Sequence, residues 1–289
     1  MKIHLKKNKL FEFNFPSLYQ IMITKLNRLW KRLLDKKKIG SFEFRMKINA
    51  PERKWYAYIL YNSAMLAKKL NFNRISAIEY GVAKGRGLLI LEEYAEEIKK
   101  LSGIQIDIYG FDRVKGLAKP KDYRDLPYLW REGLFTMDEQ KLRSKLKHAK
   151  LVLGDIEQTS LNFFSKYNPA PIGAIIHDFD LYSSTKIALS MLKAEMKYFL
   201  PRVYCYFDDT LGTERELFND FTGERLAIKE FNSDNKDIKI AKSYHFLNKT
   251  NEMWHHQIWI THFFKHKKYN DYLGDIKDWH KYPKIDDHI

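Results

Sequence analysis

Acidic residues recur at one kind of position in this sequence, directly after a short apolar run. Asp is common in the turns that follow strands, so one such residue would mean little. Here they follow consecutive runs, and ligands of open α/β sheets bind at the carboxyl ends of parallel strands. We therefore expect the carboxylates to converge on one crevice. The residues are Glu79, Asp112, Asp155, Asp178 and the pair Asp208 and Asp209.

A glycine turn follows the first of these runs. The stretch 75–87 reads ISAIEYGVAKGRG and leads into an apolar-periodic segment over 88–98. Backbone N–H groups and a helix start at such a turn can face a bound cofactor. The spacing from Gly81 is G-x-x-x-G-x-G, which matches neither the dinucleotide fingerprint nor the P-loop. The turn alone therefore leaves the cofactor open.

These acidic residues suit a nucleotide-like ligand that has a positively charged tail. Asp112 can accept both hydroxyl hydrogens of a ribose, and Asp155 can take the exocyclic amine of an adenine. Both roles fit NAD and S-adenosylmethionine equally. A pyrophosphate is anionic, whereas an aminoacyl tail with its ammonium and sulfonium tolerates Glu79 nearby. The acid-rich pocket therefore favours S-adenosylmethionine.

Strand and helix patterns alternate from residue 75 onward. Strands are expected over 75–79, 105–111, 149–153, 172–177 and 203–207, and helices over 51–70, 88–101 and 186–199. Two apolar runs, 242–247 and 257–264, suggest an antiparallel pair at the edge. The pattern predicts an α/β fold with a Rossmann-like, doubly wound, mostly parallel seven-stranded sheet, this edge pair and an N-terminal helical extension.

Length and composition limit the possible size of the fold and the setting in which the protein works. The chain has 289 residues, enough for one large domain with an appendage. Its single cysteine, Cys205, excludes an internal disulfide and favours a reducing, cytoplasmic setting. No run of 18 apolar residues or signal-peptide core appears. We expect a basic extension over 1–50, a catalytic domain over 51–267 and a tail over 268–289.

The first 50 residues carry most of the positive charge, with 13 Lys and Arg against three acidic residues. Residues 18–34 form an amphipathic basic helix. It can dock on an anionic membrane or nucleic acid, or pack on the body or a second subunit of a homo-oligomer. Alternating aromatics over 11–15 and 42–48 suggest two short strands.

Five motifs carry a resemblance: EYGVAKGRG, YGFD, GDI, HDFDLYSSTKIAL and CYFDD. Together they resemble class I S-adenosylmethionine-dependent methyltransferases of the macrocin O-methyltransferase type, in a bacterial hypothetical branch, over about residues 74–210. The resemblance implies S-adenosylmethionine as cofactor and a covering loop after the second strand. Lys84 and Arg86 depart from the small residues usual in the family's turn. The implied cofactor-binding residues are Glu79, Gly81, Gly85, Asp112, Asp155 and Asp178.

The same resemblance implies a magnesium ion on Asp178, Asp208 and Asp209. Residue chemistry supports it, because crowded carboxylates repel one another unless a cation compensates them, and oxygen ligands suit Mg²⁺. Asp180, two residues later, is the rival of Asp178. His177 is a further ligand candidate, although successive side chains on a strand point to opposite faces.

The predicted reaction is methyl transfer to a hydroxyl of a small molecule or glycan, with Asp178 and His177 as catalytic residues. His255 and His256 are further candidates for the general base, or surface histidines. An NAD enzyme fails on the glycine spacing. A nucleic-acid methyltransferase ranks lower because the chain has no N-P-P-[YF] tetrad. A non-catalytic nucleotide-binding interaction protein stays open.

Overall fold

The computed structural model describes residues 18–246 and 252–274. The chain divides into two compact units, Met1–Glu52 and Arg53–Ile289. In the first unit, helix α1 (Leu18–Lys36) precedes the short helix α2 (Phe42–Lys47). The strand expected over 42–48 is wrong, because Ser41 caps a helix there and accepts a hydrogen bond from the Phe44 N–H at 3.1 Å. The strand expected over 11–15 lies outside the described residues.

A buried ion pair joins the two helices of the first unit. Arg45 Nε of α2 lies 3.1 Å from Asp35 Oδ1 of α1, and Arg45 Nη1 donates to the Gly40 carbonyl at 2.8 Å. Both side chains are buried. A buried charge is tolerated only when it is paired and hydrogen-bonded, so this pair fixes how α1 and α2 turn against each other.

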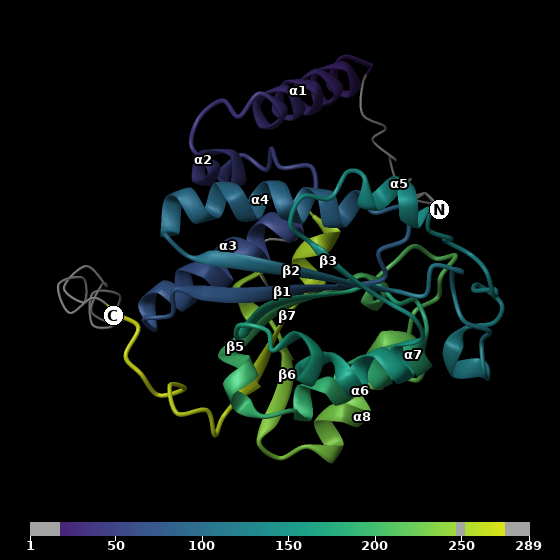
Figure 1. Cartoon of the computed structure of the whole chain (residues 1–289). Helices are drawn as coiled ribbons and strands as arrows, with labels where there is room; N and C mark the ends of the chain where they lie inside the picture. Colours follow the sequence, from purple (N-terminus) through teal and green to yellow (C-terminus); the bar gives the residue numbers. More distant parts are fainter. Residues whose placement is uncertain (1–17, 247–251, 275–289) are drawn as a thin grey trace, which may run out of the picture. The chain divides into compact units, whose positions relative to one another are not determined.

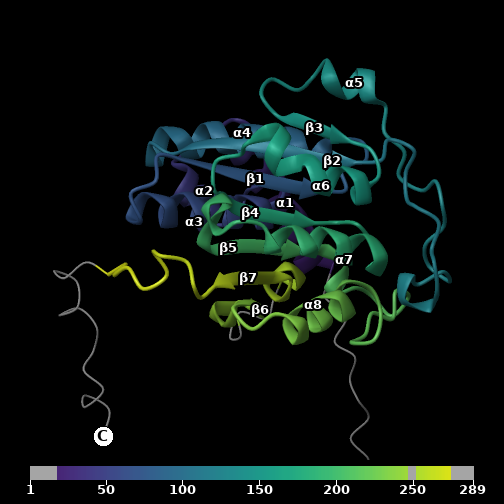
Figure 2. The same cartoon turned by 60° about the horizontal axis from the view of Figure 1, so that its bottom comes forward.

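The second unit is built on a seven-stranded sheet with the order β3-β2-β1-β4-β5-β7-β6 (Figures 1 and 2). Strands β1 to β5 run parallel, while β7 is antiparallel to both β5 and β6. The predicted doubly wound sheet with an antiparallel edge pair is confirmed. Its strands are β1 (Arg74–Tyr80), β2 (Gln105–Asp112), β3 (Lys150–Leu153), β4 (Ile172–His177), β5 (Phe199–Phe207), β6 (Ile238–Lys242) and β7 (Ile258–Phe263).

The position expected for the first edge strand is wrong. The aromatic run over 242–247 suggested a strand, but Tyr244–Phe246 forms a short 3₁₀ helix. The strand lies earlier, where Ile238 pairs with Phe263 and Ile240 pairs with Thr261. Alternation at Ile238 and Ile240 therefore outweighs the aromatic run that follows them.

Helices cover both faces of the sheet (Figure 1). Helices α3 (Lys54–Lys69) and α4 (Arg86–Ser102) lie on one face, and α6 (Ile156–Tyr167), α7 (Tyr182–Ser190) and α8 (Gly223–Asp234) lie on the other. The helix expected over 186–199 begins earlier and gives way to two 3₁₀ helices, Met191–Lys193 and Met196–Tyr198. Helices α6 and α8 were not predicted. A short helix α5 (Glu139–Arg143) precedes β3.

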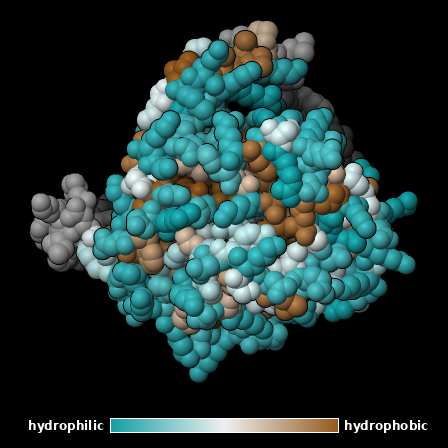
Figure 3. All heavy atoms as spheres, viewed as in Figure 1, coloured by the Kyte–Doolittle hydropathy of each residue, from teal (hydrophilic) through white to brown (hydrophobic). Residues whose placement is uncertain are grey.

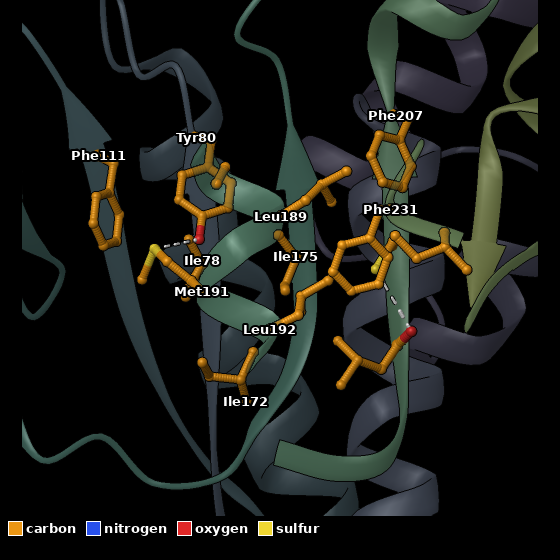
Figure 4. Close-up of a cluster of buried hydrophobic side chains, with 14 of the residues drawn as sticks. Ile78, Tyr80, Phe111, Ile172, Ile175, Leu189, Met191, Leu192, Phe207 and Phe231 are labelled. Atoms are coloured by element: carbon orange, nitrogen blue, oxygen red, sulfur yellow. Dashed lines mark hydrogen bonds between the residues drawn. The ribbon is translucent and has the colours of Figure 1, made fainter. Parts of the chain in front are cut away.

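Aromatic and aliphatic side chains together fill the core between the sheet and helices α7 and α8 (Figure 4). Tyr80 donates from its hydroxyl to Met191 Sδ at 3.1 Å, which satisfies a buried polar group inside an apolar cluster. Cys205 is fully buried in the same cluster. Among the helices that the structure describes, none combines the length and apolar character needed to cross a membrane.

Candidate functional site

The strand register brings the acidic residues to one level. Tyr80 at the end of β1 pairs with Phe111 of β2 on one side and with His177 of β4 on the other. Beyond this point the segments that follow β1 and β4 turn away from each other. The last hydrogen bonds before they diverge run from the Gly81 N–H to the Phe111 carbonyl at 3.0 Å and from the Asp178 N–H to the Tyr80 carbonyl at 3.1 Å. This is the switch point of a doubly wound sheet, where ligands bind.

A cavity of about 700 Å³ opens there. The loop between β2 and α5 supplies part of its wall, with Leu117, Trp130 and Phe135 as apolar members. The volume falls in the range usual for small-molecule sites, roughly 300–1,000 Å³. Of the residues singled out in the sequence, the wall contains Gly81, Asp112, Asp155, Asp178, Asp180, Asp208 and Asp209.

Two glycines shape the turn at the cavity, but only Gly81 lies on its wall. Gly81 has a φ of +83°, and a Cβ there would lie 1.8 Å from the Asp178 carbonyl oxygen. Gly85 has a φ of +80°, and a Cβ there would lie 2.2 Å from Leu142 Cδ1 of α5. Gly85 therefore shapes the start of α4 and its packing on α5, not the cavity wall.

Asp112 holds the glycine turn in place. Its Oδ2 accepts the Val82 N–H at 3.0 Å and the Ala83 N–H at 2.8 Å, and its Oδ1 accepts the Val114 N–H at 2.6 Å. Burial raises the pKa of Asp112, while these three hydrogen bonds oppose the rise. A carboxylate has about four lone-pair sites, so roughly one is left for a ligand.

Asp155, which follows β3, is a further carboxylate on the cavity wall. Its side chain is 58% exposed, and its Oδ1 lies 2.5 Å from Arg113 Nε. Both residues line the cavity, together with Ile156 at the start of α6. This part of the wall therefore combines one exposed carboxylate, its cationic partner and an apolar surface.

Three carboxylates crowd the ends of β4 and β5. One oxygen each of Asp178, Asp180 and Asp209 lies within 4.8 Å of the other two. The Asp180 N–H donates to Asp209 Oδ2 at 3.1 Å, a contact that the left-handed turn at Asp180 (φ +60°) allows. Burial raises the pKa of all three groups, and repulsion between neighbouring carboxylates raises it further.

Asp208 faces the same cavity but lies outside this trio. Its Oδ1 accepts the Tyr206 hydroxyl at 2.5 Å, and its carbonyl accepts Gln257 Nε2 at 2.5 Å. The set expected from the resemblance, with Asp208 beside Asp178 and Asp209, is therefore not the set that the structure gathers. Asp180, the rival in the sequence, completes the trio instead.

Glu224 is an acidic neighbour that the sequence did not reveal. It is fully buried, and its Oε2 accepts the Asp209 N–H at 2.9 Å. No described residue makes a hydrogen bond with its Oε1. Burial, then the nearby Asp209, raises its pKa well above the usual value. It lies at the start of α8, a helix that was not predicted, so no local pattern pointed to it.

Glu79 lies behind the glycine turn and is not part of the cavity wall. Its Oε1 accepts the Tyr56 hydroxyl at 2.6 Å and occupies the space that a Cβ at Gly87 would need. Burial raises the pKa of Glu79 to about 7. Glu79, for which direct cofactor contact was predicted, therefore packs between Tyr56 of α3 and Gly87 of α4.

Arg53 is a positively charged residue close to Glu79 and Asp178, and the sequence did not reveal it. Its Nη1 donates to the Tyr56 hydroxyl at 2.8 Å. Burial lowers the pKa of Arg53, but Tyr56, Glu79 and Asp178 together raise it. The start of α3 therefore places one positive charge near both Glu79 and the carboxylate trio.

His177, which was predicted to be catalytic, is a buried core residue that does not line the cavity. Its ring stacks on Phe207 at 4.1 Å, and neither ring nitrogen has a hydrogen-bond partner among the described residues. Burial lowers its pKa to about 3. Strand alternation turns it away from Asp178. His255 and His256 also lie off the cavity wall, and His255 stacks on Phe246.

The fold is shared with solved methyltransferases. The calicheamicin methyltransferase CalS11 is 16% identical, with a TM-score of 0.51 over 90% of this chain and 99% of that one. An apo structure of CalS11, described as a TDP-rhamnose 3′-O-methyltransferase, is 19% identical, with a TM-score of 0.43 over 88% of this chain and 99% of that one. An O-methyltransferase from Bacillus cereus in complex with SAH is 10% identical, with a TM-score of 0.40 over 82% of this chain and 97% of that one. No protein-family model and no curated protein sequence matches the chain. These likenesses concern the fold.

Proposed function

We propose that this protein transfers a methyl group from S-adenosylmethionine to a hydroxyl of a small molecule or glycan. One observation carries the proposal: the glycine turn and carboxylates from the ends of β2, β4 and β5 line the same cavity. A sulfonium donor is already activated, so the protein mainly has to align donor and acceptor. The shared fold with CalS11 is compatible with this chemistry.

The cofactor is proposed to occupy the end of the cavity between the glycine turn and α6. Asp112 keeps about one lone-pair site free, so it would accept one ribose hydroxyl and not both. Asp155 is exposed to the cavity and can accept the adenine amine. The methionine part would lie beside Gly81, where a side chain is excluded.

The carboxylate trio fits a hard cation. Asp178, Asp180 and Asp209 offer only oxygen ligands within 4.8 Å of one another, and burial, followed by the negative charge of neighbouring carboxylates, raises their pKa values. This donor set suits Mg²⁺. When bound, such an ion acts as a Lewis acid that lowers the pKa of a coordinated hydroxyl.

A carboxylate is proposed to accept the hydroxyl proton. Within the part of the chain that the structure describes, no histidine lines the cavity. Asp178 is partly exposed on the wall, and burial together with Asp208 and Asp209 raises its pKa. Without a bound cation, a carboxylate with a raised pKa is a stronger base than an ordinary aspartate, whereas a cation on the trio would lower that pKa and would itself activate the hydroxyl. We therefore propose Asp178, rather than His177, as the group that accepts the proton.

Calorimetric titration with S-adenosylhomocysteine, with and without Mg²⁺, tests the proposal. We expect binding by the natural protein and a loss of about tenfold or more in Asp112→Asn, which replaces one of the two acceptor oxygens by an NH₂ donor and so weakens the turn and the contact with the ribose. Asp234→Asn, at an exposed position at the end of α8, is the matched control and should bind normally. The absence of heat with both S-adenosylmethionine and S-adenosylhomocysteine would reject the methyltransferase and favour a non-catalytic protein.

A further inference from the structure

Helix α1 exposes a continuous apolar stripe. Its members are spaced three or four residues apart or are adjacent, which places them on one side of the helix. Figure 3 shows hydrophobic spheres beside hydrophilic ones on this helix. A helix usually buries such a stripe against its own protein. The exposed members, between 44% and 61% accessible, are Met22, Leu26, Leu29, Trp30 and Leu33.

The stripe is separate from the side of α1 that holds α2. Leu34 and Asp35 are buried, and Asp35 pairs with Arg45 of α2 at 3.1 Å. With 3.6 residues per turn, Asp35 points to the side of the helix opposite Leu26 and Leu33, and Leu34 lies about a quarter turn from them, next to Trp30. The hairpin of α1 and α2 therefore leaves the stripe uncovered.

Basic side chains border the stripe along one edge. Lys25, Arg32 and Lys36 flank it, and Arg28 lies next to them on the helix. All four are exposed. Asp35 is the one acidic residue of α1, and Arg45 already neutralises it. The edge therefore presents positive charge without local compensation from its own helix.

We propose that α1 lies flat on the surface of an anionic phospholipid membrane. The apolar stripe enters the boundary of the acyl chains, and the basic edge meets the lipid phosphates. Trp30 suits this depth because its ring is apolar and its N–H is polar. The 19 residues of α1 extend about 28 Å, yet the helix is too polar to span.

Charge complementarity selects this occupant over others. A nucleic acid would neutralise the basic edge but leave the apolar stripe in water. A second copy of α1 that packs antiparallel would cover the stripe but bring two basic edges together. An anionic bilayer satisfies both features at once, because phosphates and acyl chains lie next to each other at its surface.

Flotation of the full chain with vesicles tests the proposal. The protein should float with vesicles of phosphatidylcholine mixed with phosphatidylglycerol and stay behind with pure phosphatidylcholine. The triple variant Lys25→Gln, Arg28→Gln, Arg32→Gln should bind on the order of 100-fold more weakly, because each basic residue near the surface contributes about fivefold. The charge-matched control Lys99→Gln, Lys100→Gln, Lys145→Gln, at exposed positions of the second unit, should bind normally.

A second variant tests the stripe itself. Leu29→Ser, Trp30→Ser keeps every charge and should also lose flotation, while a thermal unfolding curve close to that of the natural chain shows an intact fold. Unchanged flotation of this variant would overturn the proposal. So would absence of flotation in the natural chain, binding of RNA alone, or a dimer that Leu29→Ser, Trp30→Ser dissociates.

Discussion

The two ends of the cavity carry carboxylates at equivalent strand ends and use them differently. At the β2 end, Asp112 accepts three backbone N–H groups and holds the glycine turn. At the β4 and β5 end, the trio of Asp178, Asp180 and Asp209 accepts one N–H from the described residues, that of Asp180. Backbone N–H groups compensate the carboxylate at the first end, whereas the negative charge of the carboxylates at the second end is largely uncompensated.

The difference shows that a strand-end acid in this fold is not one kind of residue. A carboxylate saturated by backbone donors stabilises the loop that surrounds it. Carboxylates that are buried near one another without donors disfavour their own ionised form. We therefore expect the β2 end to depend on backbone geometry and the β4 and β5 end to depend on cations and pH.

The largest effect is expected where the two ends touch. In Gly81→Ala the new Cβ would meet the Asp178 carbonyl oxygen at 1.8 Å, and φ is +83°. Strain and overpacking together should lower the free energy of unfolding by about 3 kcal/mol or more. Urea unfolding measures this loss. Gly103→Ala has the matching φ of +78° with nothing within 4 Å, and should lose only about 1–2 kcal/mol. Equal losses in the two variants would contradict the close contact.

The next effect concerns the trio. If Asp178, Asp180 and Asp209 hold Mg²⁺, the ion at 100 times its Kd should raise the free energy of unfolding by about 2.7 kcal/mol. Asp180→Asn should abolish this gain, and a chelator should abolish it in the natural chain. Urea unfolding with and without Mg²⁺ provides the measurement. Asp208→Asn is the control, because Asp208 lies outside the trio. The reverse outcome, with Asp208→Asn losing the gain and Asp180→Asn keeping it, would restore the set expected from the resemblance.

A smaller effect on the free energy of unfolding is expected at Glu79, which lies at neither end of the cavity. Its pKa is about 7 in the folded chain against an ordinary value of 4.5, because it is buried. The folded state therefore binds more protons, and the stability that Glu79 contributes is present below pH 4.5 and lost as the pH rises through about 7. Glu79→Gln should reduce this loss by on the order of 1 kcal/mol.

The measurement for Glu79 is the free energy of unfolding from about pH 4.5 to about pH 7. Glu96→Gln, at an exposed position of α4, should follow the natural curve. The comparison between the two variants is needed because the trio also has raised pKa values and makes the natural curve fall. Parallel curves for Glu79→Gln and Glu96→Gln would show that Glu79 is not the group concerned.

Six of the seven strands could be predicted because each is a local apolar run with a polar end, whereas β6 lies before the run that was expected to form it. The sheet order follows from such runs alternating with helices, and the edge pair follows from their closeness in sequence. What failed depends on neighbours far along the chain. Arg53 and Glu224 approach the site from α3 and α8, at least 45 residues from Asp178 in each direction, so no spacing rule could include them.

The choice between Asp180 and Asp208 was also beyond the sequence. Spacing makes both reasonable neighbours of Asp178, and the resemblance favoured Asp208. A left-handed turn at Asp180 brings its N–H to Asp209, while the Asp208 carboxylate accepts the Tyr206 hydroxyl. Backbone conformation inside a four-residue turn decided the outcome, and periodicity carries no information on it.

The smallest effect is expected at His177, the neighbour of Asp178 in sequence but not in the cavity. Its nitrogens have no partners among the described residues, so His177→Leu exchanges lost stacking on Phe207 for the removal of buried, unpaired polar atoms. The free energy of unfolding should change by less than about 1 kcal/mol, because the two contributions offset each other. Binding of S-adenosylhomocysteine and the pH dependence of methyl transfer should stay as in the natural chain. A loss of more than about tenfold in transfer, in a variant that unfolds normally, would return His177 to the reaction and erase the distinction between the acid on the wall and the histidine behind it.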